Sequence, residues 1–269
     1  RGKVAIQSKV KVDDQKSLSL AYSPGVAEPC REIEKDKDLI YTYTNKGNFV
    51  AVVSDGTAVL GLGDIGPEAA MPVMEGKAIL FKNFAGVDAF PICLATKDVD
   101  EIVETVVRLS PTFGGVNLED ISGPRCFDIE NKLKERLQIP IFHDDQHGTA
   151  VVCLAGLINA LKVVKKKLED ISVVINGAGA AGDSIAKLLY RMGCRRMIIC
   201  DQKGIIYQGR TEGMNPYKEK LAEFTNREGR QGGLAEAMQG ADVFIGVSVA
   251  NVVTPDMVRS MNDKPVIFG

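Results

Sequence analysis

Several residue types and patterns are scarce in this chain of 269 residues. It has no tryptophan and only two histidines, and its formal net charge is −2, so neither acids nor bases are in excess. No basic stretch alternates with aromatic residues, which argues against a nucleic-acid surface. No apolar run approaches the roughly 18 to 20 residues of a membrane span, so we expect no membrane segment. The six cysteines form no CxxC pair. We therefore expect buried, reduced thiols in a cytoplasmic protein.

What the chain does contain is a regular alternation of strand and helix patterns. Short apolar, β-branched runs alternate with longer amphipathic stretches, and 45% of the residues are apolar. This order predicts an α/β fold in which crossover helices join parallel strands. A long amphipathic helix is predicted from Thr149 to Lys165. The predicted strands are residues 49–54, 89–94, 115–118, 140–142, 172–176, 197–200, 242–246 and 265–268.

The organisation of the chain predicts two domains that pack directly on each other. No repeat, low-complexity segment or Pro/Ser linker is present, so the boundary near residue 147 has no flexible connector. Residues 1–147 contain nearly all the clustered acids, and residues 148–269 open their strand series with a glycine-rich turn. The chain starts without Met and stops in a predicted strand, so we expect a truncated chain with part of the site beyond its C-terminal end.

Two stretches fit the pattern GxGxxG, and only their context distinguishes them. Gly177–Gly182 follows a predicted strand, opens a predicted helix, and is followed by Asp201 at the end of the next strand. In dinucleotide-binding folds such glycines let the backbone approach the pyrophosphate, and the acid holds the ribose hydroxyls. A glycine-rich turn that binds nothing is the alternative. Gly61–Gly66 lacks this context; it is either a turn beside a site or a tight loop without function.

Acidic residues follow two of the predicted strands. Glu119 and Asp120 come after one strand, and Asp144 and Asp145 after another. Since ligands bind at the carboxyl ends of parallel strands, and clustered carboxylates need a cation, we expect Mg²⁺ or Mn²⁺ there. The alternative is that these acids cap helices.

Other polar residues near these acids permit further interpretations. His143 and His147 are four residues apart, which suggests zinc, but they flank a strand-to-helix junction rather than one helical face, so solvated or hydrogen-bonded roles fit better. Taken alone, Lys77 is predicted to be a solvated helix lysine and Tyr22 a packed turn aromatic.

Taken together, these stretches resemble the malic enzyme family, especially its compact bacterial-type members. The matching strings run in family order, together with the glycine-rich turn, through nearly the whole chain. They are Tyr22–Ala27, Ser54–Gly66, Pro72–Lys77, Gly115–Asp120 and Phe142–Ala150. The resemblance implies an N-terminal α/β substrate and metal domain followed by a Rossmann-like, doubly wound dinucleotide-binding domain.

The resemblance also implies a role for each matching residue. Glu119, Asp120 and Asp145 match the metal ligands, and Asp144 matches an acid beside them. Lys77 matches the general base and Tyr22 the general acid. The dinucleotide site matches Gly177, Gly179, Ala180, Ala181, Gly182 and Asp201. The implied reaction is oxidative decarboxylation of L-malate to pyruvate and CO₂, with reduction of NAD⁺ or NADP⁺ and a requirement for Mn²⁺ or Mg²⁺.

The chain departs from the family pattern at two points. Larger members have a substrate-binding arginine where this chain has Ala58, so recognition of the substrate carboxylate must differ. The family also continues, beyond the strand that ends this chain, with an asparagine-containing segment that contacts substrate and nicotinamide. A protein that ended at Gly269 is expected to have little activity.

Three alternatives stay open at this point. A malolactic enzyme would use much the same residues to make lactate and CO₂. A catalytically silent NAD-binding regulatory protein would bind NAD without turning over malate, and a metal-dependent hydrolase would leave the glycine-rich turn unexplained. Asp201 would repel a 2′-phosphate and so favours NAD⁺, although Lys203 offsets part of that charge. A homodimer matches the family and is the commonest soluble assembly.

Overall fold

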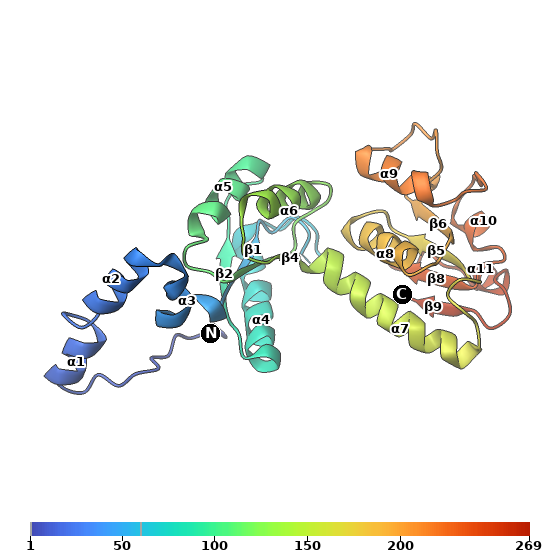
Figure 1. Ribbon diagram of the computed structural model, residues 1–269. Coiled ribbons are helices and arrows are strands. Elements are labelled where there is room, and N and C mark those ends of the chain that lie inside the picture. Colours follow the sequence, from blue (N-terminus) through green and yellow to red (C-terminus); the bar gives the residue numbers. More distant parts are fainter. Residues whose placement is uncertain (1, 60) are drawn as a thin grey trace. The chain divides into compact units, whose positions relative to one another are not determined.

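The computed structural model divides the chain into two compact units (Figure 1). The N-terminal unit comprises Arg1–Ile121 and Asp128–Phe142, and the C-terminal unit comprises Ser122–Phe127 and His143–Gly269. The structure describes residues 2–59 and 61–269. Arg1 lies outside the described residues, as does Leu60, which belongs to one of the strings that resemble the malic enzyme family.

The N-terminal unit begins with short helices and continues with strands joined by longer helices. None of the residues in α1, α2 or α3 is buried. The helices are α1 (Gln15–Ala21), α2 (Ala27–Lys35), η1 (Lys37–Leu39), α3 (Ile40–Tyr43), η2 (Lys46–Asn48), α4 (Pro67–Ala85), α5 (Val99–Leu109) and α6 (Arg125–Arg136). The strands are β1 (Phe49–Ser54), β2 (Asp88–Cys93), β3 (Gly115–Leu118) and β4 (Ile141–His143).

The first sheet has the strand order β2-β1-β3-β4, and β1 pairs in parallel with both β2 and β3. Val52 of β1 and Ala89 of β2 pack with Met74 and Ala78 of α4 in one apolar cluster. Strand β3 is buried along its whole length, which suits a strand of a parallel sheet that is covered on both faces. Glu119 and Asp120 directly follow the last residue of β3, so they lie at the carboxyl edge of the sheet.

The C-terminal unit is a second α/β layer structure with strand order β7-β6-β5-β8-β9. Every pairing is parallel except that of β6 with β7. The strands are β5 (Ser172–Asn176), β6 (Arg196–Asp201), β7 (Gly204–Ile205), β8 (Val243–Gly246) and β9 (Val266–Phe268). The helices are η3 (Asp144–Gly148), α7 (Thr149–Val164), α8 (Ala180–Arg191), α9 (Pro216–Phe224), α10 (Leu234–Met238) and α11 (Pro255–Arg259).

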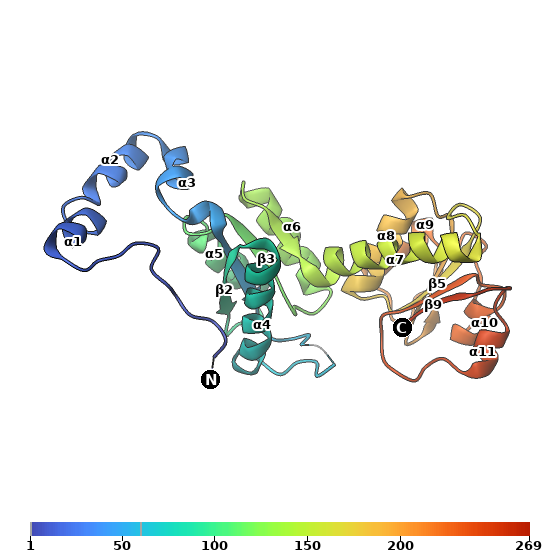
Figure 2. The same ribbon diagram turned by 90° about the horizontal axis from the view of Figure 1, so that it is seen from below.

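Alternate residues of the second sheet build two separate cores. Val173 and Ile175 of β5 pack with Leu157 of α7 and Leu189 of α8. Val174, between them in the sequence, packs in a different cluster with residues of α10. Figure 2 shows α10 and α11 on the opposite side of this sheet from α7 and α8. Helices on both faces of a mostly parallel sheet make this a doubly wound unit, as the sequence predicts.

The predicted strands agree with the observed ones to within one or two residues at each end. The exception is β7, which the sequence analysis does not predict. It has only Gly204 and Ile205, and it pairs antiparallel with Cys200 and Asp201 at the edge of the sheet. Two residues carry no periodicity, so such a strand is visible only once its partner strand is in place.

The prediction that all six cysteines are buried is wrong for three of them, because Cys30 is exposed and Cys93 and Cys153 are only partly buried. All six are free thiols, and Cys126, Cys194 and Cys200 are buried. Cys30 lies on α2, which has no buried residues. Burial raises the pKa of Cys194 to about 11 and that of Cys200 to about 12, so both thiols stay protonated near neutrality.

One helical stretch has the length and composition that a membrane span would need. Residues Asp144–Val164 form 21 consecutive helical residues with a mean hydropathy of 1.6 in their most apolar window, and 17% of that window is buried. Length and composition alone would allow this stretch to cross a membrane. Core helices of soluble proteins have the same length and composition, and Leu157 and Leu161 of α7 lie in the core of the C-terminal unit.

Candidate active site

The centre of the candidate site in the N-terminal unit is a lysine paired with a buried carboxylate. Lys77 Nζ, on α4, lies 3.2 Å from Glu119 Oε1, directly after β3. The side chain of Glu119 is 6% exposed and that of Lys77 is 20% exposed. The prediction from sequence alone that Lys77 is a solvated lysine is therefore wrong. A buried carboxylate needs compensating charge, and Lys77 supplies it.

Asn117 holds the other oxygen of Glu119. Its Nδ2 donates a hydrogen bond to Glu119 Oε2 at 2.7 Å, and Asn117 is only 2% exposed within β3. One carboxylate oxygen therefore faces the lysine and the other faces the amide. Asn117 was not among the predicted site residues, although a polar side chain inside the short apolar strand Gly115–Leu118 is a signal that could have revealed it.

Asp120 has an unusual backbone conformation next to Glu119. Its φ is 53°, in the left-handed region that few non-glycine residues adopt, although aspartate tolerates it better than most. Asp120 is 4% exposed, and its carbonyl accepts a hydrogen bond from Ala58 N at 2.9 Å. Such strained positions cluster at functional sites. Two consecutive buried carboxylates, Glu119 and Asp120, therefore lie at the carboxyl edge of the first sheet.

The first GxGxxG stretch folds back onto a turn beside this edge. The carbonyl of Gly56 accepts hydrogen bonds from Ile65 N and Gly66 N, both at 3.1 Å. Gly56 has φ +71°, and a Cβ there would overlap the carbonyl of Gly66. The close approach of these two backbone segments requires glycine at position 56, and Gly63 and Gly66 have positive φ angles of 78° and 83°, whereas a Cβ at Gly61 would meet no atom within 4 Å. Asp55, which is 1% exposed, accepts hydrogen bonds from the backbone and hydroxyl of Thr57 in the same turn.

The stretch His143–Gly148 is a strand end followed by a π-helical turn. His143 ends β4, residues Asp144–Gly148 form the turn η3, and α7 starts at Thr149. π-helical turns are rare and often lie at functional sites. A Cβ at Gly148 would overlap the carboxylate of Asp144, so the glycine makes room for that side chain. His143 Nε2 lies 4.0 Å from Asp145 Oδ2, and the two histidines do not share one helical face.

The predicted catalytic residues are distributed over both units. Lys77, Glu119 and Asp120 belong to the N-terminal unit, whereas Asp144 and Asp145 belong to the C-terminal unit. Strands β3 and β4 are neighbours in the first sheet, and each pair of acids directly follows one of them.

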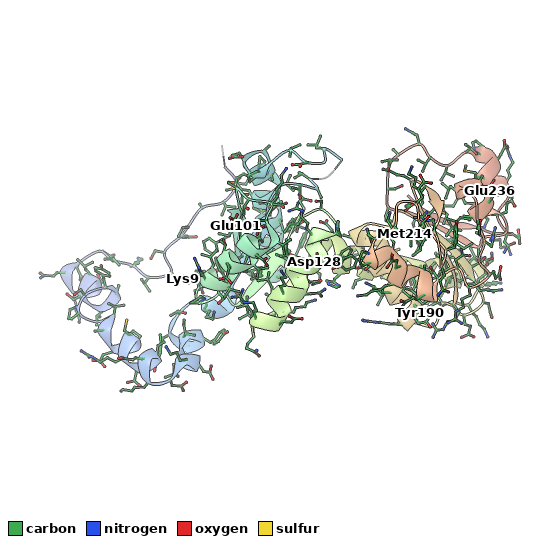
Figure 3. All side chains as sticks on the ribbon, turned by 90° about the horizontal axis from the view of Figure 1, so that it is seen from above. Lys9, Glu101, Asp128, Tyr190, Met214 and Glu236 are labelled. Carbon is green, nitrogen blue, oxygen red and sulfur yellow. The ribbon has the colours of Figure 1, made fainter. Side chains whose placement is uncertain are left out.

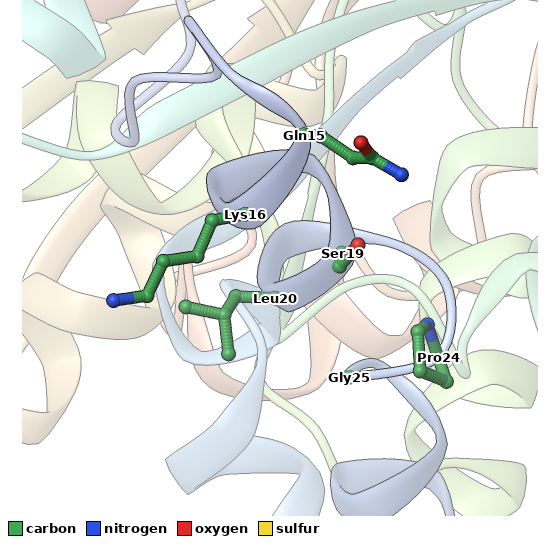
Figure 4. Close-up of a pocket in the computed structure, with 6 residues that line it drawn as sticks. All are labelled: Gln15, Lys16, Ser19, Leu20, Pro24 and Gly25. Atoms are coloured by element: carbon green, nitrogen blue, oxygen red, sulfur yellow. The ribbon is translucent and has the colours of Figure 1, made fainter.

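Tyr22 lies in the helical segment at the start of the chain. It ends α1 and is 70% exposed, so the prediction of a packed turn aromatic is wrong. Beside it, Gln15, Lys16, Ser19, Leu20, Pro24 and Gly25 line a hollow of about 600 Å³ (Figure 4). The side chain of Tyr22 is thus largely accessible to solvent.

The glycine-rich turn of the C-terminal unit has the geometry of a dinucleotide-binding loop. It leads from β5 into α8, and a Cβ at Gly182 would overlap the carbonyl of Gly177. Gly177 has φ +125°, and a Cβ there would lie 2.6 Å from the carbonyl oxygen of Val247. A Cβ at Gly179 would meet no atom within 4 Å, so this glycine faces open space. The two outer glycines are required by packing, and the middle one leaves room for a ligand at the helix N-terminus.

Asp201 ends β6 next to the start of this loop. Asn176 and Cys200 are register partners in β5 and β6, and Gly177 N donates to the carbonyl of Cys200 at 2.8 Å. Asp201 therefore directly follows Cys200, the residue of β6 that is hydrogen-bonded to the first residue of the loop. The sequence prediction that this acid accompanies the glycine-rich turn agrees with this geometry.

Two cations hold the Asp201 carboxylate. Arg210 forms a bidentate ion pair with it, and Lys218 Nζ lies 2.7 Å from Oδ2. Burial would raise the pKa of Asp201, but these hydrogen bonds outweigh burial and hold the pKa at about 2. Asp201 is thus ionised near neutral pH. Arg210 and Lys218 were not among the predicted site residues, because nothing in their local sequence pattern distinguishes them from surface cations.

Two family profiles match the chain almost from end to end. The profile described as the malic enzyme N-terminal domain matches residues 1–134, and that described as the malic enzyme NAD binding domain matches residues 146–269. A bifunctional malic/malolactic enzyme of Bacillus subtilis (strain 168) is 62% identical over 268 residues, which cover 100% of this chain and 65% of that protein.

Other relatives differ in the cofactor that their names give. An NAD-dependent malic enzyme of Geobacillus stearothermophilus is 57% identical over 99% of this chain and 56% of its own length, and further relatives are named NADP-dependent malic enzymes. The crystal structure of an NAD-dependent malic enzyme from Thermotoga maritima superposes with a TM-score of 0.96 at 50% identity, covering 99% of this chain and 71% of that one. The chain thus spans less than two thirds of the length of the first two relatives.

Proposed function

The chain belongs to the malic enzyme family, and from this premise we propose that it forms the catalytic part of an enzyme that oxidatively decarboxylates L-malate. The products are pyruvate, CO₂ and a reduced nicotinamide cofactor. The observation that carries the proposal is the contact between Lys77 and the buried Glu119, in a chain that also has a dinucleotide-type glycine loop. Residues 1–147 are proposed as the malate and metal domain, and residues 148–269 as the NAD(P)-binding domain.

We further propose that Glu119, Asp120 and Asp145 together hold a divalent cation. The donor set fits Mn²⁺ or Mg²⁺, because all three residues offer carboxylate oxygens, and two of them are buried where an uncompensated negative charge would be costly. When bound, such a cation would act as a Lewis acid toward the oxygen atoms of the substrate. Asp144, beside Asp145 in η3, is proposed to support this ligand set.

Proton transfers are assigned to two residues of the N-terminal unit. Lys77 would accept the proton of the C2 hydroxyl, and a bound nicotinamide would supply the hydride acceptor for C2. The Lys77 amine lies 3.2 Å from Oε1 of Glu119, one of the proposed metal ligands, which supports this assignment. Tyr22 delivers a proton to C3 after CO₂ has left, and its exposure leaves the hydroxyl accessible.

The cofactor is proposed to lie on the loop Gly177–Gly182, with its pyrophosphate at the N-terminus of α8. The residues assigned to it are Gly177, Gly179, Ala180, Ala181, Gly182 and Asp201. Asp201 stays ionised and disfavours a 2′-phosphate, which supports a preference for NAD⁺ over NADP⁺. Arg210 and Lys218 offset part of its charge, so the expected preference is modest, about tenfold. We also propose that the protein is a cytoplasmic homodimer, with no nucleic-acid or membrane partner.

The experiment that tests the proposed function is a turnover assay with product analysis. Full-length protein is incubated with L-malate and Mn²⁺, with either NAD⁺ or NADP⁺, and reduced cofactor, pyruvate and lactate are measured together. Reduced cofactor in equal amount to pyruvate, with no product after chelation of the metal, is the expected result. Binding of NAD⁺ without any product would instead support the silent regulatory protein.

A malolactic activity is the second candidate. The relative from Bacillus subtilis is named a bifunctional malic/malolactic enzyme, and it is 62% identical to this chain. The same assay separates the two activities, since lactate formed without net reduction of the cofactor would identify the malolactic reaction.

A further inference from the structure

A second cavity lies in the C-terminal unit, at the edge of the sheet away from the glycine-rich loop. It has a volume of about 290 Å³. Its walls come from the first residues of β5 and β6, from the loop at residues 226–230, and from α10. The loop Gly177–Gly182 and Asp201 lie at the opposite, carboxyl ends of the same strands. This cavity is therefore separate from the proposed cofactor site.

The charge of the cavity lining is strongly positive. Arg195, Arg196, Arg227 and Arg230 line it, together with one acid, Glu228. Within residues 2–59 and 61–269, no carboxylate lies within 4.0 Å of a guanidinium nitrogen of these four arginines. By contrast, Arg210, Arg136 and Arg259 each pair with an acid. Four arginines around one hollow in a chain of net charge −2 repel one another unless an anion joins them.

Uncharged groups hold three of these arginines in place. The guanidinium of Arg195 stacks 4.2 Å from the ring centre of Tyr190 and donates to the Tyr190 carbonyl. Arg227 donates to the Tyr190 hydroxyl at 3.1 Å. Arg230 donates to the carbonyl of Glu236. Figure 3 labels both supporting residues, Tyr190 on α8 and Glu236 on α10. Neutral acceptors and a π face orient the guanidinium groups without neutralising them.

The floor of the cavity is apolar and buried. Val174 and Ile198 belong to the core between the sheet and α10, and Ala237 and Ala241 complete the lining on that side. An apolar floor lowers the local dielectric constant, so an anion placed against it interacts more strongly with the arginines than it would on an open surface. Its volume is at the lower end of small-molecule sites and is too small for a whole dinucleotide.

We propose that this arginine cavity, lined by Arg195, Arg196, Arg227 and Arg230, binds a small organic anion with at least two negative charges. Phosphoryl and carboxylate groups share the planar or forked oxygen geometry that guanidinium groups recognise in bidentate fashion. The ligand class is therefore a phosphorylated or polycarboxylate metabolite. The cavity adjoins the amino ends of β5 and β6, whereas the proposed cofactor site lies at their carboxyl ends. The anion and the cofactor would therefore bind at opposite ends of the same strands.

The test is calorimetric titration of the full chain in metal-free buffer, with pyrophosphate in one arm and citrate in the other. Each titration is run with and without saturating NAD⁺, so that binding at the glycine-rich loop is separated from binding in the arginine cavity. We expect saturable binding of at least one probe that is insensitive to NAD⁺. The stronger probe identifies phosphoryl or carboxylate chemistry as the better match.

Three variants make the result specific. The double substitution Arg196→Ala with Arg227→Ala should weaken binding by at least about tenfold. Arg196→Lys with Arg227→Lys keeps the charge and should weaken it less. Arg259→Gln removes one positive charge on α11, outside the cavity, and should leave binding unchanged. Melting temperatures of all variants confirm that they are folded. Absence of saturable binding up to about 10 mM, or equal binding by wild type and the double alanine variant, would overturn the proposal.

Discussion

Lys77 on α4 and Glu119 after β3 form an ion pair, with 3.2 Å between Nζ and Oε1. The pair joins two residues with different proposed roles, since one is assigned to proton transfer and the other to the metal. Asn117 takes the second oxygen of Glu119 at 2.7 Å. The orientation of the glutamate and the position of the lysine amine are therefore coupled through one carboxylate.

Replacing Lys77 tests its role as the base. Lys77→Met should lower kcat for malate oxidation by about 10²- to 10⁴-fold, because the variant lacks the amine that is assigned to take the hydroxyl proton. Lys82→Met, on the same helix, is the matched control, because Lys82 pairs with Asp88 rather than with Glu119. Steady-state kinetics of both variants give the comparison. If Lys77→Met retained a kcat within about threefold of wild type, the proton would have to leave by another route.

Asn117 is predicted to be a positioning residue for the metal ligand Glu119. Asn117→Ala should weaken Mn²⁺ binding by about ten- to a hundredfold, because Glu119 loses the hydrogen bond that fixes its orientation. Saturating Mn²⁺ should restore most of kcat. Mn²⁺ titration followed by electron paramagnetic resonance measures the affinity directly. A variant with unchanged Mn²⁺ affinity but lower thermal stability would show that Asn117 is only structural.

Substitution of two glycines in the loop Gly177–Gly182 should affect different properties, stability in one case and NAD⁺ binding in the other. Gly182→Ala places a methyl group into the carbonyl of Gly177, so we expect a loss of stability and a lower melting temperature. Gly179→Ala meets no atom within 4 Å and should melt like wild type, but it should weaken NAD⁺ binding by about tenfold or more, since the added methyl occupies the space left for the pyrophosphate. Calorimetry with NAD⁺ and thermal melts separate the two effects. Wild-type NAD⁺ affinity in Gly179→Ala would remove this glycine from the site.

Stability at acid pH should depend on Asp242. Burial raises its pKa, but hydrogen bonds from Lys166, Ser172 and Asn262 outweigh burial and hold the pKa at about 2, below the ordinary 3.8. The stabilisation is present above the unfolded-state pKa near 4 and disappears as the pH falls from about 4 to 2, because protonation removes the charge that those groups bind. It amounts to roughly 2 kcal/mol.

Denaturant unfolding between pH 7 and pH 2 checks this prediction. Asp242→Asn should be less stable at neutral pH and should lose less stability than wild type as the pH falls below 4. Asp256→Asn is the control, since Asp256 is an exposed acid on α11. If the free energy of unfolding depended on pH in the same way in wild type and in Asp242→Asn, other acids would be responsible for the loss of stability at low pH.

Much of the fold could be predicted because it depends on short-range patterns. Strands such as Ser172–Asn176 are continuous apolar runs, and the alternation of strands and helices determines a parallel arrangement. The loop Gly177–Gly182 is visible in sequence because its first and last positions leave no room for a Cβ and so require glycine. β7 was missed, since two residues at a sheet edge have no pattern of their own.

The individual side-chain environments could not be predicted in the same way. Lys77 was predicted to be solvated and Tyr22 to be packed, whereas the first is mostly buried against Glu119 and the second is 70% exposed. Exposure depends on which elements cover a residue, and the sequence around these two residues does not contain that information.

The sequence by itself determined the α/β class, the strands, the glycine-rich loop and the presence of acids after β3 and β4, because periodicity and backbone sterics act over a few neighbouring residues. The tertiary structure alone decided that Arg210 and Lys218 hold Asp201, that Lys77 meets Glu119, and that four arginines surround one cavity. Electrostatic and hydrogen-bonding partners are chosen by distance in space. That distance is fixed only when the strands have paired and the helices have packed on them.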